Sequence, residues 1–162
     1  MFSQSASGQI ITESLGCSFP TVSLYVADTV RCENPNTFMS NMLYALSILY
    51  KSKLPLIVVF NKIDVLDHSF AEKWMKDFDE FDAALSKCTN YLASLSRSMS
   101  LVLEEFYSNI RSVGVSALTN KGFDDQLIEK FIDAEKEYTE IFLPEIEKKI
   151  ASKQKEAPEG AL

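Results

Sequence analysis

The segment Leu54–Asp64, with the sequence LPLIVVFNKID, constrains the fold of this chain more than any other. Its first seven residues hold five branched aliphatic side chains and a phenylalanine. An unbroken apolar run of this length is typical of a strand buried on both faces, as in a parallel sheet covered by helices. The group Asn61-Lys62-Ile63-Asp64 follows at the carboxyl end, which is where open α/β sheets bind ligands. The segment therefore predicts an α/β fold with a candidate ligand site at the end of this strand.

The N-K-x-D group has the chemistry to recognise guanine. An ionised carboxylate at Asp64 only accepts hydrogen bonds, so it can take both the N1–H and the N2–H of guanine. Adenine offers no matching pair of donors. Asn61 can bridge the base and the neighbouring loop, and the aliphatic stem of Lys62 can cover one face of the ring. The alternative is a strand that ends in a polar turn, in which Asp64 caps the next helix, and four residues alone do not decide between the two.

Length and composition restrict the class of protein. The 162 residues suffice for one domain with its own core, and 46% hydrophobic content is unlike a disordered chain. A net charge of −7 argues against a general nucleic-acid or anionic-membrane surface. The sequence shows neither a signal peptide nor an apolar run near twenty residues, so we expect no membrane span. The three cysteines lack metal-ligand spacing and His68 is the only histidine, which favours reduced thiols, no metal site and no Ser-His-Asp triad.

The residues before this strand predict a βαβ unit. Thr21–Asp28 reads as a strand, and Asn34 and Pro35 suit the N-cap and first position of a helix that closes at Lys51–Lys53. A strand, a helix and a strand in this order predict a right-handed unit and a parallel sheet. Asp28 imitates a Walker B aspartate, but that function needs a phosphate loop, which the sequence does not contain. We favour the alternative, a core strand with Asp28 in the following turn.

Several other segments show helical periodicity. Gly8–Phe19 is expected to form a short helix that Pro20 ends, with Ile10, Ile11 and Leu15 facing inward, and Met1–Ser7 is expected to be irregular. Near the other end, Phe123–Leu143 is expected to form an amphipathic helix that Pro144 ends or kinks.

A heavy aromatic stripe follows the N-K-x-D group. Ser69 and Glu72 match a capping box, and five large side chains then fall on one helical face: Phe70, Trp74, Phe78, Phe81 and Leu85. A second helix is expected over Tyr91–Ile110. Either these stripes pack on each other and on the sheet, or part of the segment Ser69–Ile110 forms a dimer or client surface.

Ser112–Ser116 is expected to be a third short strand, ending in Ser116-Ala117-Leu118. Backbone N–H groups of that turn can reach the O6 acceptor of guanine. The whole of 1–150 is interpreted as one domain, and 151–162 as a disordered tail.

Four stretches together resemble the GPN-loop GTPase family: SASGQIITE, ENPNTFMSNMLYALSILYKSKLPLIVVFNKIDVLDHSFA, SRSMSLVLEEFY and VGVSAL. The resemblance covers most of the chain from Ser5 to about Tyr138. It implies a P-loop-type GTPase domain, with a parallel sheet in a three-layer α/β/α arrangement and a helical insertion at about 67–110. It also implies that Asn61, Lys62 and Asp64 bind the guanine of GTP or GDP, and that the Ser116-Ala117 turn completes the base pocket.

The resemblance is strongest to the member of the family that acts in RNA polymerase II assembly and nuclear import. It implies homo- or heterodimers with related GPN-loop proteins, and RNA polymerase II subunits or assembly factors as partners. It further implies a cytoplasmic protein that shuttles to the nucleus. From the net charge and the lack of an apolar span, we expect contact with neither nucleic acid nor membrane.

The motifs with which that family handles phosphate do not occur in this sequence. There is no G-x-x-x-x-G-K-[ST] loop, no Gly-Pro-Asn signature and no D-x-x-G motif. Ser5–Gly8 align just past the last of these, so we expect the C-terminal portion of such a GTPase, with its N-terminal strands missing and Mg²⁺ bound only by a complete chain. We predict no catalytic residue here, and an open edge at Tyr25 that favours self-association. The alternative is a shortened, non-catalytic paralogue that acts as a protein-binding partner.

Overall fold

The computed structural model describes residues 5–86, 98, 100–146 and 148. Within them, three parallel strands form a sheet in the order β1-β2-β3, with bounds β1 Ser23–Asp28, β2 Leu56–Asn61 and β3 Arg111–Val115. In register, Ser23 of β1 pairs with Leu56, and Ile57 of β2 pairs with Arg111. Because all three strands run the same way, their carboxyl ends meet at one edge of the sheet.

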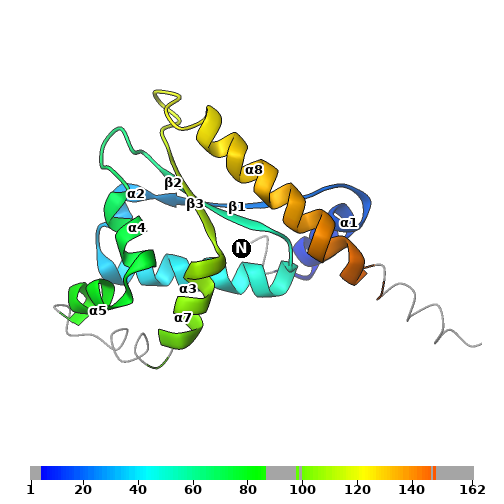
Figure 1. Cartoon of the computed structure of the whole chain (residues 1–162), viewed down its shortest axis with the longest axis horizontal. Coiled ribbons are helices and arrows are strands. Elements are labelled where there is room, and N and C mark those ends of the chain that lie inside the picture. Colours follow the sequence, from blue (N-terminus) through cyan, green and yellow to red (C-terminus); the bar gives the residue numbers. More distant parts are fainter. Residues whose placement is uncertain (1–4, 87–97, 99, 147, 149–162) are drawn as a thin grey trace, which may run out of the picture.

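Strand β2 is buried on both faces, as its unbroken apolar sequence predicts. Leu56, Val58 and Phe60 belong to a core that includes residues of helix α3 (Pro35–Ser52). The alternate residues Ile57 and Val59 belong to a second core with helix α8 (Asp125–Glu137). Figure 1 shows α3 and α8 on opposite sides of the sheet. The predicted three-layer α/β/α arrangement is therefore confirmed.

Helix α3 begins and ends where the sequence predicts. The Asn34 side chain accepts hydrogen bonds from the backbone N–H groups of Asn36 (3.0 Å) and Thr37 (3.4 Å), so it caps the helix with Pro35 in the first position. The helix stops at Lys53, whose φ of 55° is left-handed. Between β1 and α3 lies a single short helical turn, α2 (Thr29–Cys32).

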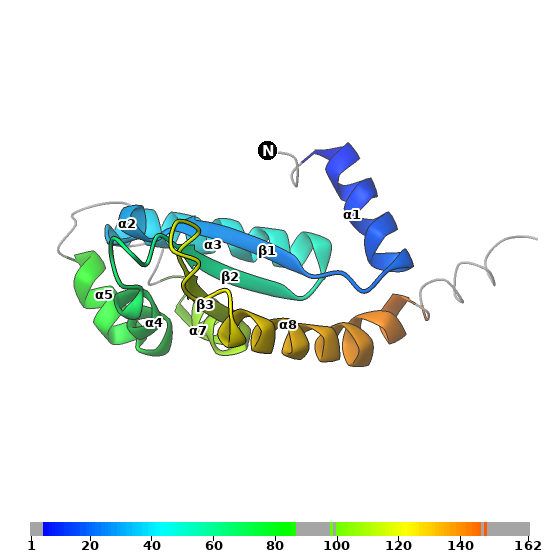
Figure 2. The ribbon, with the colours of Figure 1, turned by 90° about the horizontal axis from the view of Figure 1, so that it is seen from above.

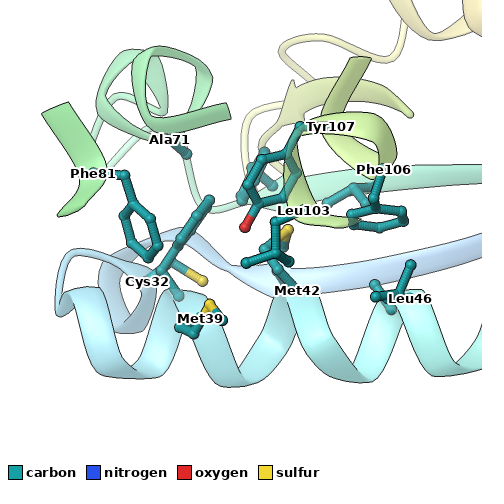
Figure 3. Packing of buried hydrophobic residues seen from close by; sticks show 14 of the residues in the cluster. Cys32, Met39, Met42, Leu46, Ala71, Phe81, Leu103, Phe106 and Tyr107 are labelled. Carbon is teal, nitrogen blue, oxygen red and sulfur yellow. The ribbon is translucent and has the colours of Figure 1, made fainter. Parts of the chain in front are cut away.

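In the described part of the segment between β2 and β3 lie the helices α4 (Ser69–Lys76), α5 (Phe78–Ser86) and α7 (Ser100–Asn109). They pack on the α3 side of the sheet, where the ring of Phe38 lies 5.2 Å from that of Trp74 and 5.4 Å from that of Phe81. Figure 3 shows Phe81 and Tyr107 facing α3 across this core. Phe81 and Leu85 of the aromatic stripe are buried in this core, whereas Phe70, Trp74 and Phe78 are half-buried and pack against it.

Two local predictions about this insertion were wrong. The stripe is divided between two helices, because Asp77 is extended (φ −125°, ψ 99°) and its carboxylate accepts from the N–H of Glu80 at 3.1 Å, which starts α5. Ser69 is not an N-cap but the first residue of α4, and its N–H donates to the side chain of Asp67 at 3.2 Å. The first part of the predicted helix Tyr91–Ile110 lies outside the described residues, so only Ser100–Asn109 can be compared with it.

Helix α1 (Ala6–Ser18) begins earlier than predicted, and the side that it buries carries Gly8 and Gly16 rather than the predicted apolar residues. The Ser5 side chain caps it by accepting from Gly8 N–H at 3.0 Å. The residues expected inside are exposed instead: Ile10 by 64%, Ile11 by 46% and Leu15 by 48%. The reason is the close approach of Gly16 to Leu54 and Phe142, where an added Cβ would meet side-chain atoms at 3.0 and 3.3 Å.

The C-terminal helix differs from its prediction at both ends. It begins at Asp125 and passes at residue 138 into a π-helical turn, η2 (Tyr138–Phe142), in which the N–H of Leu143 bonds to the carbonyl of Tyr138. Pro144 then lies within helix 143–146 and does not end it. Proline has no backbone N–H to donate, and the wider π-helical turn shifts the hydrogen-bond pattern of the helix directly before it. The predicted tail 151–162 lies outside the described residues. Across the part of the chain that is described, every helix is too short or too polar to cross a membrane.

Gly114 of β3 generates a test of this packing. A Cβ at that position would lie 2.4 Å from the ring of His68, which stacks on Phe60 with centroids 6.2 Å apart. We expect Gly114→Ala to lower the free energy of unfolding by about 1–3 kcal/mol, as overpacking does, measured by urea denaturation. In a His68→Ala background the same change should cost much less. An equal cost in both backgrounds would mean that the ring contact is not its cause.

Candidate functional site

The carboxyl ends of the three strands bring the predicted site residues together. Asn61, the last residue of β2, is in register with Asp28 of β1 and with Val115 of β3. The N–H of Ile63 donates to the carbonyl of Val115 at 3.2 Å, which ties the N-K-x-D loop to the end of β3. The Ser116-Ala117 turn therefore lies directly beside Asn61 and Asp64.

Asp64 is held by Ser116. The Ser116 hydroxyl, in a fully buried residue, donates to Oδ1 of Asp64 at 2.5 Å and accepts from the N–H of Thr119 at 3.2 Å. Asp64 does not cap a helix, since α4 begins only at Ser69. Its carboxylate is exposed and oriented by one hydroxyl, so it retains acceptor sites that face solvent. The carboxylate of Asp64 can therefore accept further hydrogen bonds from donors on a ligand.

Asn61 joins the two turns. Its Oδ1 accepts from the N–H of Lys62 at 2.8 Å and from the N–H of Ala117 at 3.1 Å. With both bonds on the oxygen, the amide nitrogen is the group left to donate to a ligand. The Ala117 N–H, expected to reach guanine O6, is here donated to Asn61, so it would have to exchange that bond for one to the base.

Two residues of β1 and α2 support the site, and the sequence did not identify them as part of it. The hydroxyl of Thr29, a fully buried residue, donates to the carbonyl of Asn61 at 2.6 Å and fixes the end of β2. The carboxylate of Asp28 accepts from the Nζ of Lys62 at 2.6 Å and also caps α2. The only signal in the sequence was the position of Asp28 and Thr29 at the end of a predicted neighbouring strand.

Lys62 combines a strained backbone with an exposed ion pair. Its φ of 75° lies in the left-handed region, which non-glycine residues rarely occupy and which often marks functional loops. The hydrogen bond from Lys62 lowers the pKa of Asp28 below the ordinary carboxyl value, and the N–H groups of Arg31 and Val30 act in the same direction. The Lys62 side chain is 52% exposed, so its stem lies at the surface beside Asn61 and Asp64.

A glycine turn fixes the position of Ser116. The N–H of Ser116 donates to the carbonyl of Lys121 at 2.8 Å, and the next residue, Gly122, has a φ of +82°. An added Cβ at Gly122 would come within 2.1 Å of the carbonyl oxygen of Gly114, so only glycine fits in this turn. Among the described residues, no cluster of His, Cys, Asp and Glu forms a metal site.

The chain is similar to proteins of known class. The family profile described as "Conserved hypothetical ATP binding protein" matches residues 1–136. GPN-loop GTPase 1 of Dictyostelium discoideum is 54% identical over 161 residues, which is 99% of this chain and 40% of that protein. GPN-loop GTPase QQT2 of Arabidopsis thaliana is 52% identical over 95% of this chain and 40% of its own length. GPN-loop GTPase 1 of Saccharomyces cerevisiae is 51% identical, over 95% of this chain and 42% of its own length.

A solved structure has the same fold. The GTPase from Pyrococcus abyssi, determined in its apo form, superimposes with a TM-score of 0.63 at 22% identity. The match covers 80% of this chain and 52% of the archaeal one. The chain thus spans about two fifths of the length of the curated relatives above and half of the solved GTPase.

The ion pair between Asp28 and Lys62 generates a prediction with a defined pH dependence. Asn caps helices as well as Asp does, so Asp28→Asn keeps the cap of α2 and removes only the charge. We expect it to lower the free energy of unfolding at neutral pH by less than about 1 kcal/mol, since the pair is half-exposed. Because the folded pKa is lowered, this stability is present above the ordinary carboxyl value of 3.8 and is lost as pH falls through the lowered value.

The measurement is urea denaturation of both proteins at neutral and at acid pH, with Lys62→Met as the matched partner of the cycle. In the Lys62→Met background, Asp28→Asn should cost less than it does in the unaltered chain. A difference between wild type and Asp28→Asn that grows in acid would contradict the assignment.

Proposed function

Because the chain belongs to the GPN-loop GTPase family, we propose that it binds the guanine base of GTP or GDP through Asn61, Lys62, Asp64 and the Ser116-Ala117 turn. The observation that carries the proposal is the placement of an exposed, hydroxyl-oriented carboxylate next to a side-chain amide at the carboxyl edge of the sheet. In this arrangement, Asp64 accepts from N1–H and N2–H of guanine. Asn61 donates through its amide nitrogen, and the stem of Lys62 covers one face of the ring.

The chemistry of the site favours guanine over adenine. The family profile is described as ATP binding, whereas the similar proteins are GTPases. An ionised carboxylate has no proton to donate, and adenine offers it no pair of adjacent donors. Adenine at this position would leave Asp64 facing an unprotonated ring nitrogen and unpaired, and sites with unpaired polar groups reject such analogues strongly. We therefore expect a guanine nucleotide, despite the wording of the profile.

The proposal covers recognition of the base and not hydrolysis. The phosphate loop, the Gly-Pro-Asn signature and the D-x-x-G motif of the family do not occur in this sequence. Phosphoryl transfer depends on a phosphate cradle, its lysine and Mg²⁺, and none of the five base-site residues supplies them. Roles in RNA polymerase II assembly and nuclear import, dimers with related GPN-loop proteins and shuttling between cytoplasm and nucleus stay predictions from the resemblance.

The base assignment is tested by Asp64→Asn. Hydrogen bonds to a charged group contribute about 1.5–3 kcal/mol each, so the change should weaken GDP binding by roughly 2–4 kcal/mol. Asparagine can donate to O2 of xanthine, so affinity for XDP should rise. Isothermal titration of the chain with GDP, XDP and ADP measures all three affinities.

Asp67→Asn is the matched control, because Asp67 is an exposed carboxylate three residues further along that bonds only within its own loop and helix start. It should leave the preference for GDP over XDP and ADP unchanged. Equal GDP affinity of the wild type and Asp64→Asn would sink the assignment of Asp64 as the residue that reads guanine.

We also predict that the 162-residue chain alone does not hydrolyse GTP. The assay is phosphate release from GTP with Mg²⁺ at neutral pH, with the full-length Saccharomyces cerevisiae relative as the positive control. Turnover by the monomeric chain at the rate of the full-length protein would show that this chain holds phosphate-binding groups that its motifs do not reveal.

A further inference from the structure

The ring of His68 contacts both strands that carry the proposed base site. It stacks on Phe60 of β2 with ring centroids 6.2 Å apart. It also lies so close to β3 that a Cβ on Gly114 would come within 2.4 Å of its Nδ1 and Cε1 atoms. Phe60 and Gly114 are partners in the register of the two strands, so the ring covers one cross-strand pair. Asn61 directly follows Phe60, and Ser116 lies two residues after Gly114.

Gly114 provides the room for this ring. Its neighbours in β3, Val113 and Val115, are both buried valines, as a central strand requires. A glycine between them weakens the strand, and it often marks a place where another group approaches the backbone closely. At Gly114 that group is the imidazole of His68. The glycine therefore lets the segment before α4 come into contact with the backbone of β3.

The loop 62–67 is attached to β3 at both of its ends. At its start, the N–H of Ile63 donates to the carbonyl of Val115 at 3.2 Å. At its end, His68 packs on Gly114, the residue directly before Val115. Asp64 lies between the two attachments, and Figures 1 and 2 show this loop and the turn after β3 at the same end of the sheet. Two contacts with adjacent residues of one strand thus confine the loop that carries Asp64.

Helix α4 holds His68 from the other side. The carbonyl of His68 accepts from the N–H groups of Ala71 at 2.9 Å and of Glu72 at 3.2 Å, where the helix begins. The Nε2 atom lies 3.2 Å from Oε1 of Glu72, and Oε2 of the same carboxylate lies 3.9 Å from Nζ of Lys76. The helix therefore fixes both the backbone and the ring of His68 against the sheet.

The polarity of the ring is unfavourable at this position. Its Nδ1 atom is buried, and no described residue forms a hydrogen bond with it. Oδ1 of Asp67 lies 3.8 Å away, which is beyond hydrogen-bond distance. A buried polar atom without a partner destabilises a fold, and an apolar ring of similar size would avoid that cost. Departures of this kind from the most stable choice are expected beside functional sites.

We propose that His68 is a positioning residue of the base site, which holds the loop 62–67 on β3 so that Asp64 meets the hydroxyl of Ser116. The proposal rests on the function proposed above, because its effect is exerted through Asp64. A carboxylate in a fixed orientation accepts from N1–H and N2–H of guanine together. When the loop is attached at one end only, Asp64 still accepts one of these bonds but rarely both at once.

The test compares GDP with IDP, whose base lacks the N2 amino group, by isothermal titration of the 162-residue chain. The wild type should bind GDP at least about tenfold more tightly, since one bond to a charged acceptor is at stake. In His68→Ala this ratio should fall below about threefold, because a loosely held site loses its geometry. A loss of stability alone would weaken both nucleotides by the same factor and leave the ratio unchanged.

Hydrogen exchange of the ligand-free chain tests the attachment of the loop directly. The N–H of Ile63 donates to β3, and the N–H of Thr119 donates to the hydroxyl of Ser116. Both should exchange at least about tenfold faster in folded His68→Ala than in the wild type, because the local structure opens more often. The N–H of Lys53, which donates to the carbonyl of Leu49 at the end of α3, should exchange at the same rate in both proteins.

A second variant reaches the same contact from β3. Gly114→Ala should displace the ring of His68 and lower the ratio of GDP to IDP affinity in the same way. Because both changes act through one contact, the double variant should be no worse than His68→Ala alone. Lys76→Ala is the matched control, since Lys76 lies on the same helix and its side chain is 80% exposed. It should keep the ratio of the wild type.

The outcomes separate this proposal from the base assignment. If the wild type prefers GDP to IDP and His68→Ala keeps that preference, His68 does not position Asp64, and the base assignment stands. Unchanged exchange of the Ile63 and Thr119 amides in His68→Ala would overturn the positioning role even without any nucleotide. Additive losses in the double variant would overturn it as well. A wild type that binds GDP and IDP equally would overturn the base assignment, and this proposal with it.

Discussion

Burial of β2 on both faces is the constraint on which the rest of the structure depends. A strand that places Phe60 in one core and Val59 in another must have a helical layer on each side and a strand on each edge. Fully burying such a side chain contributes about 1.5–3 kcal/mol, so a shift of register by one residue would be costly. The same register aligns Asp28, Asn61 and Val115 at one edge. The hydrophobic core thus sets the geometry of the polar site, because both are properties of one strand.

Structural features that depend on interactions between neighbouring residues in the sequence could be predicted. The cap of α3 by Asn34, the buried strand and its parallel neighbours depend on a few consecutive residues, and the structure contains all of them. The predicted site residues Asn61, Asp64 and Ser116 lie together because parallel strands end at one edge. The base-reading role of these residues stays a prediction, since their contacts in the structure are with one another.

Features that depend on contacts between distant segments could not be predicted in this way. The ion pair of Lys62 with Asp28 spans 34 positions and needs the register of two strands. The predicted orientation of helix α1 was wrong, because its apolar periodicity predicted that Ile10 and Leu15 face the core. Its actual contact is made by a glycine against Leu54, which periodicity cannot reveal. Likewise, the stripe after Ser69 has helical spacing throughout, yet one extended residue at Asp77 divides it.

The supports of the proposed base site differ in strength, and the difference follows from burial. Thr29 and Ser116 are fully buried, so breaking their hydrogen bonds to Asn61 and Asp64 would leave polar atoms unpaired at a cost of about 1–3 kcal/mol each. Lys62 is held only by an exposed pair worth less than about 1 kcal/mol. The groups that we propose to accept from and donate to a base are therefore held by buried hydrogen bonds, whereas the side chain that we propose to cover the ring is held only weakly.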